Sequence, residues 1–234
     1  MDEMPTAASQ TPLDPVALWG DAHRRVCDLV VALPEEEMRR TVPATPDWTA
    51  RELLAHMVGL GADVLAGNED PDHAASWTSA QVASRADRDS SEIVAEWRSL
   101  AEDLQRHMRE HGARPLADLM IHEQDLRGAV GRPGAQDDHG HAWVSRRMLG
   151  RASDALAGGP SLALVSPSGS WSSHGGSPDT ADVEVRTSDF DLARALCSRR
   201  TESQLRSWTV RGDLDLVRAA FTLVGPLPEN ELPC

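Results

Sequence analysis

The 234-residue sequence contains no lysine, no tyrosine, only two phenylalanines and only three cysteines. Cys27, Cys197 and Cys234 are an odd number at wide spacing, which argues against a disulfide framework and fits a reducing cytoplasm. No two of them have metal-ligand spacing. A metal bound by this chain would therefore be held by nitrogen and oxygen atoms.

Positive charge is also scarce, and the formal net charge is −14 at pH 7. Because no basic stripe is available to neutralise phosphates, we expect neither a nucleic-acid partner nor binding to an anionic membrane surface. No apolar run approaches the roughly 20 residues that span a bilayer. Residues 1–15 are acidic and lack the apolar region of a signal peptide. We therefore expect a cytoplasmic protein whose partners are small molecules.

Apolar residues recur at helical spacing in four segments of the first half of the chain. Thr49 and Asp89 each begin a capping box with a glutamate three residues later, which marks the starts of two of these helices. Four amphipathic helices joined in this way are typical of an antiparallel bundle, in which metal sites form between facing helices. The predicted helices cover residues 14–33, 49–66, 90–112 and 115–131, with a loop and a short helical piece in residues 67–88.

The pattern changes after Gly158, where Gly, Pro and Ser turns separate short segments typical of strands. We predict the fold class α+β, with a disordered N-terminus in residues 1–13, a helical bundle in residues 14–158 and a small α+β domain in residues 159–234. The later predicted elements are a helix in 142–157, strands in 161–167, 169–175 and 181–187, a helix in 189–199, a strand in 207–212 and a helix in 213–224.

Two of the predicted helices carry histidines that are placed to bind one metal ion. His56 lies in the segment WTARELLAHMVG, and the segment DLMIHEQDLRGAVG contains Asp118 and His122. Asp118 and His122 are four residues apart, so they share one face of a helix. A carboxylate and an imidazole from one helix, joined by an imidazole from a neighbour, would leave a coordination position open, as in catalytic zinc sites.

Each of these residues also has a plainer interpretation. His56 alone could be a half-buried histidine with one hydrogen bond, and Asp118 with His122 could be a surface pair that stabilises a helix. Glu123 follows His122 directly but points about 100° away from it on a helix, so Asp118 is the preferred ligand. Asp125 could orient a ligand imidazole from behind, or it could be a solvated carboxylate.

Other residues with reactive or metal-binding side chains are weaker candidates. His139 and His141 lie in a turn-rich segment, where their spacing could imitate a metal site. Cys27 and Cys197 fall in apolar helical patterns, so we expect them to be buried and not nucleophilic.

The motifs W-T-A-R-E-L-L-A-H, D-x3-H-x2-D and DLRGAVGRPG resemble those of the mycothiol-dependent maleylpyruvate isomerase family of actinobacteria. The resemblance covers nearly the whole chain from Asp14 onward. It implies a DinB-like four-helix bundle followed by a small α+β domain similar to a sterol carrier protein. By motif match the metal ligands are His56, Asp118 and His122, where Asp118 replaces a glutamate that is one methylene longer. Asp125 matches the trailing acidic position.

The resemblance also implies a role for an arginine in the C-terminal domain. In the segment LCSRR, Arg199 takes the arginine position of the family's L-x-G-R turn, and Ser198 replaces its glycine. The planar guanidinium of Arg199 could bind a carboxylate of the substrate or of the thiol as a catalytic residue. Alternatively, Arg199 could be a surface arginine near a helix end.

A divalent metal with an open coordination position, zinc by preference, could activate either water or a thiol. The chain offers no obvious cysteine for that role, so the thiol would come from outside, and the resemblance supplies mycothiol. Our leading hypothesis is a cis–trans isomerisation of a substrate such as maleylpyruvate, in which the thiol adds to a double bond and then leaves. The alternatives are transfer of mycothiol to electrophiles, metal-assisted hydrolysis, and a non-catalytic small-molecule binder that has lost the chemistry.

Overall fold

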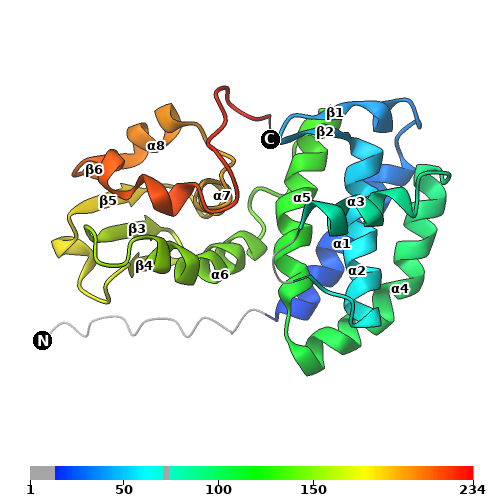
Figure 1. Ribbon diagram of the computed structural model, residues 1–234, viewed down its shortest axis with the longest axis horizontal. Helices are drawn as coiled ribbons and strands as arrows, with labels where there is room; N and C mark the ends of the chain where they lie inside the picture. Colours follow the sequence, from blue (N-terminus) through cyan, green and yellow to red (C-terminus); the bar gives the residue numbers. More distant parts are fainter. Residues whose placement is uncertain (1–13, 71–73, 234) are drawn as a thin grey trace, which may run out of the picture.

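The computed structural model describes residues 14–70 and 74–233, which form two units that lie side by side (Figure 1). The N-terminal unit consists mainly of long helices, and the C-terminal unit contains shorter helices and a four-stranded sheet. This mixture of helices and sheets confirms the predicted α+β class. The N-terminal segment that was predicted to be disordered lies outside the described residues.

Four long helices build the N-terminal unit, and each was predicted from the sequence to within a few residues. They are α1 (Pro15–Val31), α2 (Ala50–Ala66), α4 (Ser90–His111) and α5 (Arg114–Val130). Helices α1 and α2 each pack against both α4 and α5, so the four helices close into a ring. The interior of this ring is the apolar core of the unit.

The helix starts follow from the capping residues. The side chain of Thr49 accepts a hydrogen bond from the backbone N–H of Glu52, and the Glu52 carboxylate accepts one from the backbone N–H of Thr49 at 2.8 Å. Asp89 and Glu92 form the same reciprocal pair at the start of α4. Both predicted capping boxes are therefore confirmed, and the first one sets the register of the helix that carries His56.

Shorter elements complete the N-terminal unit. The predicted helical piece between α2 and α4 is α3 (Ala75–Ala83), which packs against α2. The segment between α1 and α2 contains the 3-10 helix η1 (Glu37–Arg39) and two antiparallel strands, β1 (Thr41–Val42) and β2 (Thr45–Thr49), which were not predicted from the sequence. Strands of two and five residues are too short to produce a clear alternating pattern.

Helix α6 (Gly140–Ala155) connects the two units, because it contacts α5 of the N-terminal unit as well as later elements. The sheet of the C-terminal unit contains β3 (Leu162–Ser166), β4 (Gly169–Ser172), β5 (Val183–Arg186) and β6 (Thr209–Arg211). Its strand order is β4-β3-β5-β6, in which β3 and β5 are parallel and the outer pairs are antiparallel. Because α6 contacts both units, the boundary near residue 158 stays a prediction. The helices of the C-terminal unit are η2 (Pro178–Thr180), α7 (Asp189–Leu196), α8 (Glu202–Trp208) and η3 (Leu214–Phe221).

The predicted strands of this unit are confirmed. One helix was not predicted, and one predicted helix has a different helical form. Helix α8 was missed, although Thr201 and Gln204 form a third capping box at its start. The last predicted helix is present as the 3-10 helix η3. Both elements are short, and helices of one or two turns depend on packing more than on local propensity.

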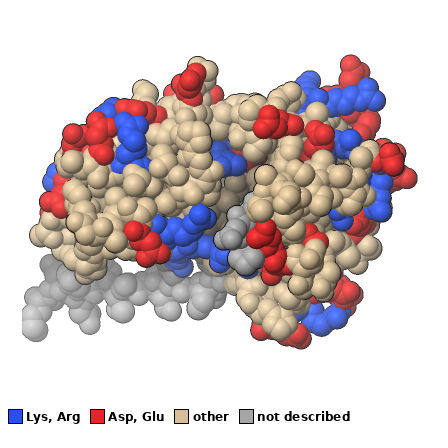
Figure 2. Space-filling model, in the orientation of Figure 1, with Lys and Arg blue, Asp and Glu red and all other residues tan. Residues whose placement is uncertain are grey.

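Charged side chains of both signs are interspersed over both units on the face shown in Figure 2. Among the described residues, no helix is both long enough and apolar enough to cross a membrane.

A buried histidine lies in the aromatic core of the N-terminal unit. The ring of His23 stacks on Trp19 at a centroid distance of 4.9 Å and lies edge-on to Trp97 at 4.7 Å. Its Nε2 lies 3.5 Å from the Sγ of Cys27. Burial, followed by the positive charge of Arg98, lowers the pKa of His23 to about 4. His23 is therefore a neutral part of the core.

We expect His23 to destabilise the protein in acid. Its folded pKa of about 4 lies below the ordinary value of 6.5, so the unfolded chain binds the proton more tightly between these two values. The free energy of unfolding should therefore fall as the pH decreases through this window, by roughly 3 kcal/mol from this residue. Urea titrations at several pH values measure the effect, and His23→Gln should flatten it. Parallel pH profiles for the two proteins would show that another group is responsible.

Candidate metal centre

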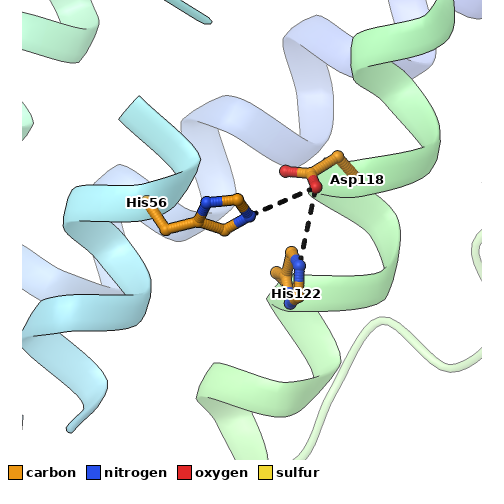
Figure 3. Close-up of side chains that lie close together, drawn as sticks. All are labelled: His56, Asp118 and His122. Atoms are coloured by element: carbon orange, nitrogen blue, oxygen red, sulfur yellow. Dashed lines mark ion pairs between the residues drawn. The ribbon is translucent and has the colours of Figure 1, made fainter. Parts of the chain in front are cut away.

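The three predicted metal ligands meet between α2 and α5 (Figure 3). The Oδ1 atom of Asp118 lies 3.5 Å from the Nε2 of His56 and 3.5 Å from the Nε2 of His122. One ligand atom from each residue lies within 4.8 Å of the other two. The two imidazole rings are nearly perpendicular, with centroids 5.2 Å apart. Side chains from two helices are thus brought to one point.

The hydrogen bond behind His56 determines which of its nitrogens faces this point. The Nδ1 of His56 lies 2.8 Å from the Oε1 of Gln81, and the Nε2 of Gln81 donates to the Oδ2 of Asp63 at 2.7 Å. Because a carboxylate only accepts, the amide nitrogen of Gln81 must face Asp63, and its oxygen must face His56. The Nδ1 of His56 therefore carries the proton, and the lone pair of a neutral ring is on Nε2.

His122 is oriented in the same way from the other side. Its Nδ1 donates to the Oδ2 of Asp125 at 3.1 Å, which again leaves the Nε2 lone pair of a neutral ring directed toward Asp118. Such hydrogen bonds behind metal-bound histidines are a regular feature of protein metal sites. A tetrahedral zinc ion with bonds of about 2.1 Å separates its ligand atoms by about 3.4 Å. The observed nitrogen–oxygen separations of 3.5 Å fit this requirement.

The electrostatics of the centre favour positive charge between these side chains. Burial alone would lower the pKa of His56, but the Asp118 carboxylate and the hydrogen bonds to Asp118 and Gln81 raise it above its ordinary value. His56 is only 3% exposed. A proton or a divalent cation is therefore stabilised at this point by the same groups.

Asp125 is a buried acceptor and not a solvated carboxylate. Besides His122, it contacts two arginines of the C-terminal unit. The Nη2 of Arg194 lies 2.7 Å from its Oδ1, and the Nη2 of Arg199 lies 3.2 Å from its Oδ2. Burial alone would raise the pKa of Asp125, but the two guanidinium groups and His122 hold it well below its usual range. The carboxylate therefore stays ionised and links His122 to the second unit.

Arg199 lies beside this carboxylate, so its interpretation as a surface arginine is wrong. Its side chain is 12% exposed, and its Nη1 donates to the carbonyl oxygen of Cys197 at 2.7 Å. The preceding residue, Ser198, has a positive φ of 58°, in the region that favours glycine. The backbone of Ser198 thus adopts the conformation expected from the glycine it replaces.

Two residues at this centre, Gln81 and Arg194, were not predicted from the sequence. Gln81 lies in a polar segment without a motif. Arg194 lies in a helical pattern, and it also donates to the carbonyl oxygen of Ile121 at 3.1 Å. A possible signal for Arg194 was its position among apolar residues on the buried side of α7, where it is 3% exposed. An arginine at such a position requires an anionic partner.

The weaker candidates lie outside this centre. The carboxylate of Glu123 is fully buried in ion pairs with Arg25 and Arg127, as expected if it points away from Asp118. The Nε2 of His141 lies 2.9 Å from the carbonyl oxygen of Ala135. Within residues 14–70 and 74–233, the group with metal-ligand spacing is His56, Asp118 and His122.

We expect Asp125→Asn to destabilise the protein by about 3 kcal/mol, because it leaves two buried guanidinium groups without their anion. Chemical denaturation of the metal-free protein measures this loss. The matched control is Asp28→Asn, which removes a carboxylate from an exposed ion pair with Arg98 and should change stability by less than about 1 kcal/mol. Equal losses in the two variants would contradict the importance of the buried cluster.

Comparison with known protein families supports the resemblance found in the motifs. A model of the family described as mycothiol maleylpyruvate isomerase N-terminal domain matches residues 19–149, which is more than half of the chain. The matched region contains His56, Asp118 and His122. Searches of the curated proteins and of the solved structures found no match. The chain belongs to the mycothiol maleylpyruvate isomerase N-terminal domain family.

Proposed function

We propose that this protein is a metal-dependent enzyme that uses an external low-molecular-weight thiol, mycothiol, to isomerise a small cis-configured electrophile such as maleylpyruvate. The observation that carries the proposal is the convergence of two imidazole nitrogens and one carboxylate oxygen at distances that suit a tetrahedral cation. Membership of the family supports the use of mycothiol.

In this proposal, His56, Asp118 and His122 hold a divalent cation, zinc by preference, and leave one coordination position open. When bound there, such a cation supplies the charge that converts a thiol into a thiolate near neutral pH. The chain's own described cysteines are poor alternatives. Cys27 and Cys197 are buried, and burial raises the pKa of each thiol to about 11. Neither cysteine of the described residues is suited to be the reacting thiol, and the proposal takes that thiol from outside the chain.

The proposed isomerisation consists of an addition step and an elimination step, and it consumes no thiol. Addition of the thiolate sulfur to one carbon of the double bond breaks its π bond and moves that electron pair onto the conjugated carbonyl group of the substrate as an enolate. A single bond remains, about which the substrate can rotate. Elimination of the same thiol restores the double bond in the trans form and regenerates the thiol. We assign Arg199 to hold a substrate carboxylate, since its buried Nε has no hydrogen-bond partner within the described residues and its guanidinium lies beside the centre. Asp125 holds the ring of His122.

The proposal includes an architecture. The closed ring of α1, α2, α4 and α5 supports a DinB-like four-helix bundle, with the metal site between two facing helices. The four-stranded C-terminal unit is proposed to be the sterol-carrier-like domain implied by the motifs. We propose that residues 14–158 and 159–234 form the two domains. We also propose that the protein is located in the cytoplasm.

We expect the purified protein to bind about one equivalent of zinc. His56→Ala and His122→Ala should each reduce the bound metal to less than about a tenth of that, because two ligands do not hold the ion. Elemental analysis after exposure to zinc and dialysis measures the content. His107→Ala on α4 removes a histidine from outside the centre and should have no effect. Wild-type protein without metal would favour the non-catalytic binder.

We expect turnover of maleylpyruvate to require added mycothiol without consuming it. Net loss of thiol would instead indicate a transferase, and turnover without thiol would indicate hydrolysis.

Arg199→Lys keeps the charge but loses the planar fork, so it should lower kcat/KM for the carboxylate substrate by about tenfold or more, mainly through KM. An uncharged electrophile should be unaffected. Equal losses for both substrates would show that Arg199 does not bind the carboxylate.

A further inference from the structure

We propose that Gln81 on α3 is a positioning residue that makes the Nε2 of His56 available to the metal, and that Gly59 permits α3 to approach closely enough for this role. The inference rests on the proposed metal-binding function of His56. It adds to that function an element of the fold, α3, that contributes no ligand of its own.

The first observation is a chain of hydrogen bonds that starts and ends on α2. Gln81 is 4% exposed and bridges His56 and Asp63, with separations of 2.8 Å and 2.7 Å. The other oxygen of Asp63, Oδ1, accepts from the side-chain amide of Asn68 at 3.2 Å. Asp63 is therefore held in place, and it in turn determines which way the Gln81 amide faces. The consequence is that His56 meets an acceptor, and not a donor, at its Nδ1.

The second observation is the packing beneath this bridge. His56, Gly59 and Asp63 occur at positions i, i+3 and i+7 of α2, so they share one face of the helix. A Cβ atom added to Gly59 would lie 2.5 Å from the Cβ of Gln81 and 2.8 Å from its Cγ. Because the Cβ of Gln81 is bound directly to its backbone, α3 itself would have to move away. Glycine at this position is thus what allows the amide to reach His56.

These two observations predict different effects for two buried glycines of the same helix. At Gly61, an added Cβ would meet a methyl group at the flexible end of Leu104, at 2.9 Å, on the side of α4. Ala at either position raises helix propensity equally. Only the substitution at Gly59 displaces α3. Gly61→Ala is therefore a matched control for Gly59→Ala.

The test measures zinc affinity by competition with a chelator, without any assay of activity. Gln81→Leu removes the acceptor behind His56 and should weaken zinc binding by about 10-fold to 100-fold, as other such partners do. Gly59→Ala should weaken it by about tenfold, whereas Gly61→Ala should stay within about twofold of wild type. Affinities of Gln81→Leu and Gly59→Ala equal to that of wild type would overturn the inference.

A second readout separates this inference from the proposed function. Because Gln81 accepts from the Nδ1–H of His56, this ring proton should appear in NMR spectra as a signal that exchanges slowly with solvent, in wild type and in Gly61→Ala. It should be lost in Gln81→Leu and weakened in Gly59→Ala. If wild type bound no zinc, the proposed function would be wrong, and this signal alone would decide the positioning role. A signal unchanged in Gln81→Leu would overturn it.

Discussion

The close approach of three electron-rich atoms between α2 and α5 is the constraint on which the rest of the site depends. The carboxylate oxygen of Asp118 lies 3.5 Å from each of two imidazole nitrogens, and opposing lone pairs at this distance are unfavourable unless positive charge lies between them. The fold maintains this arrangement by holding each imidazole from behind, His56 through Gln81 and His122 through Asp125. Locally unfavourable geometry of this kind persists at functional sites because the surrounding structure over-determines it.

The two supporting hydrogen bonds depend on different parts of the molecule. Gln81 belongs to α3, which packs against α2, whereas Asp125 is held by Arg194 and Arg199 of the C-terminal unit. A buried ion pair adds little net stability compared with an apolar pair of the same size, but breaking it is costly. The cluster around Asp125 therefore specifies how the C-terminal unit docks on α5 more than it stabilises the fold. Orientation of His122 and docking of the unit are thus linked through one carboxylate.

Local features of the chain were predictable, and non-local contacts were not. The capping boxes at Thr49 and Asp89 and the shared face of Asp118 and His122 depend on residues within one helical turn, so the sequence alone predicted them. The pairing of these residues with His56 depends on how α2 packs against α5, and it was predicted from the motifs and the family resemblance. Gln81 could not be found in this way, because a glutamine in a polar segment has many alternative roles and its partner lies 25 residues away.

Several short elements were not predicted from the sequence, for a related reason. The strands β1 and β2, the helix α8 and the 3-10 form of η3 contain too few residues for periodicity to distinguish them. Their conformation is decided by packing against longer elements, which a single sequence does not display. The C-terminal arginines follow the same rule. Their burial was not visible in the sequence, yet it determines whether they are surface charges or partners of Asp125.

The formal charges around the metal centre affect its affinity for anionic reactants. Asp63, Asp118 and Asp125 together with Arg194 and Arg199 leave one net negative charge, which a divalent cation would change to one net positive charge. The whole chain carries −14, so its distant field repels a thiolate or a dicarboxylate. At physiological ionic strength, however, charges farther than about 8 Å from a reactant are largely screened. The nearby arginines and the proposed cation therefore decide the affinity for anions, which is consistent with a site that binds small anionic reactants inside an acidic protein.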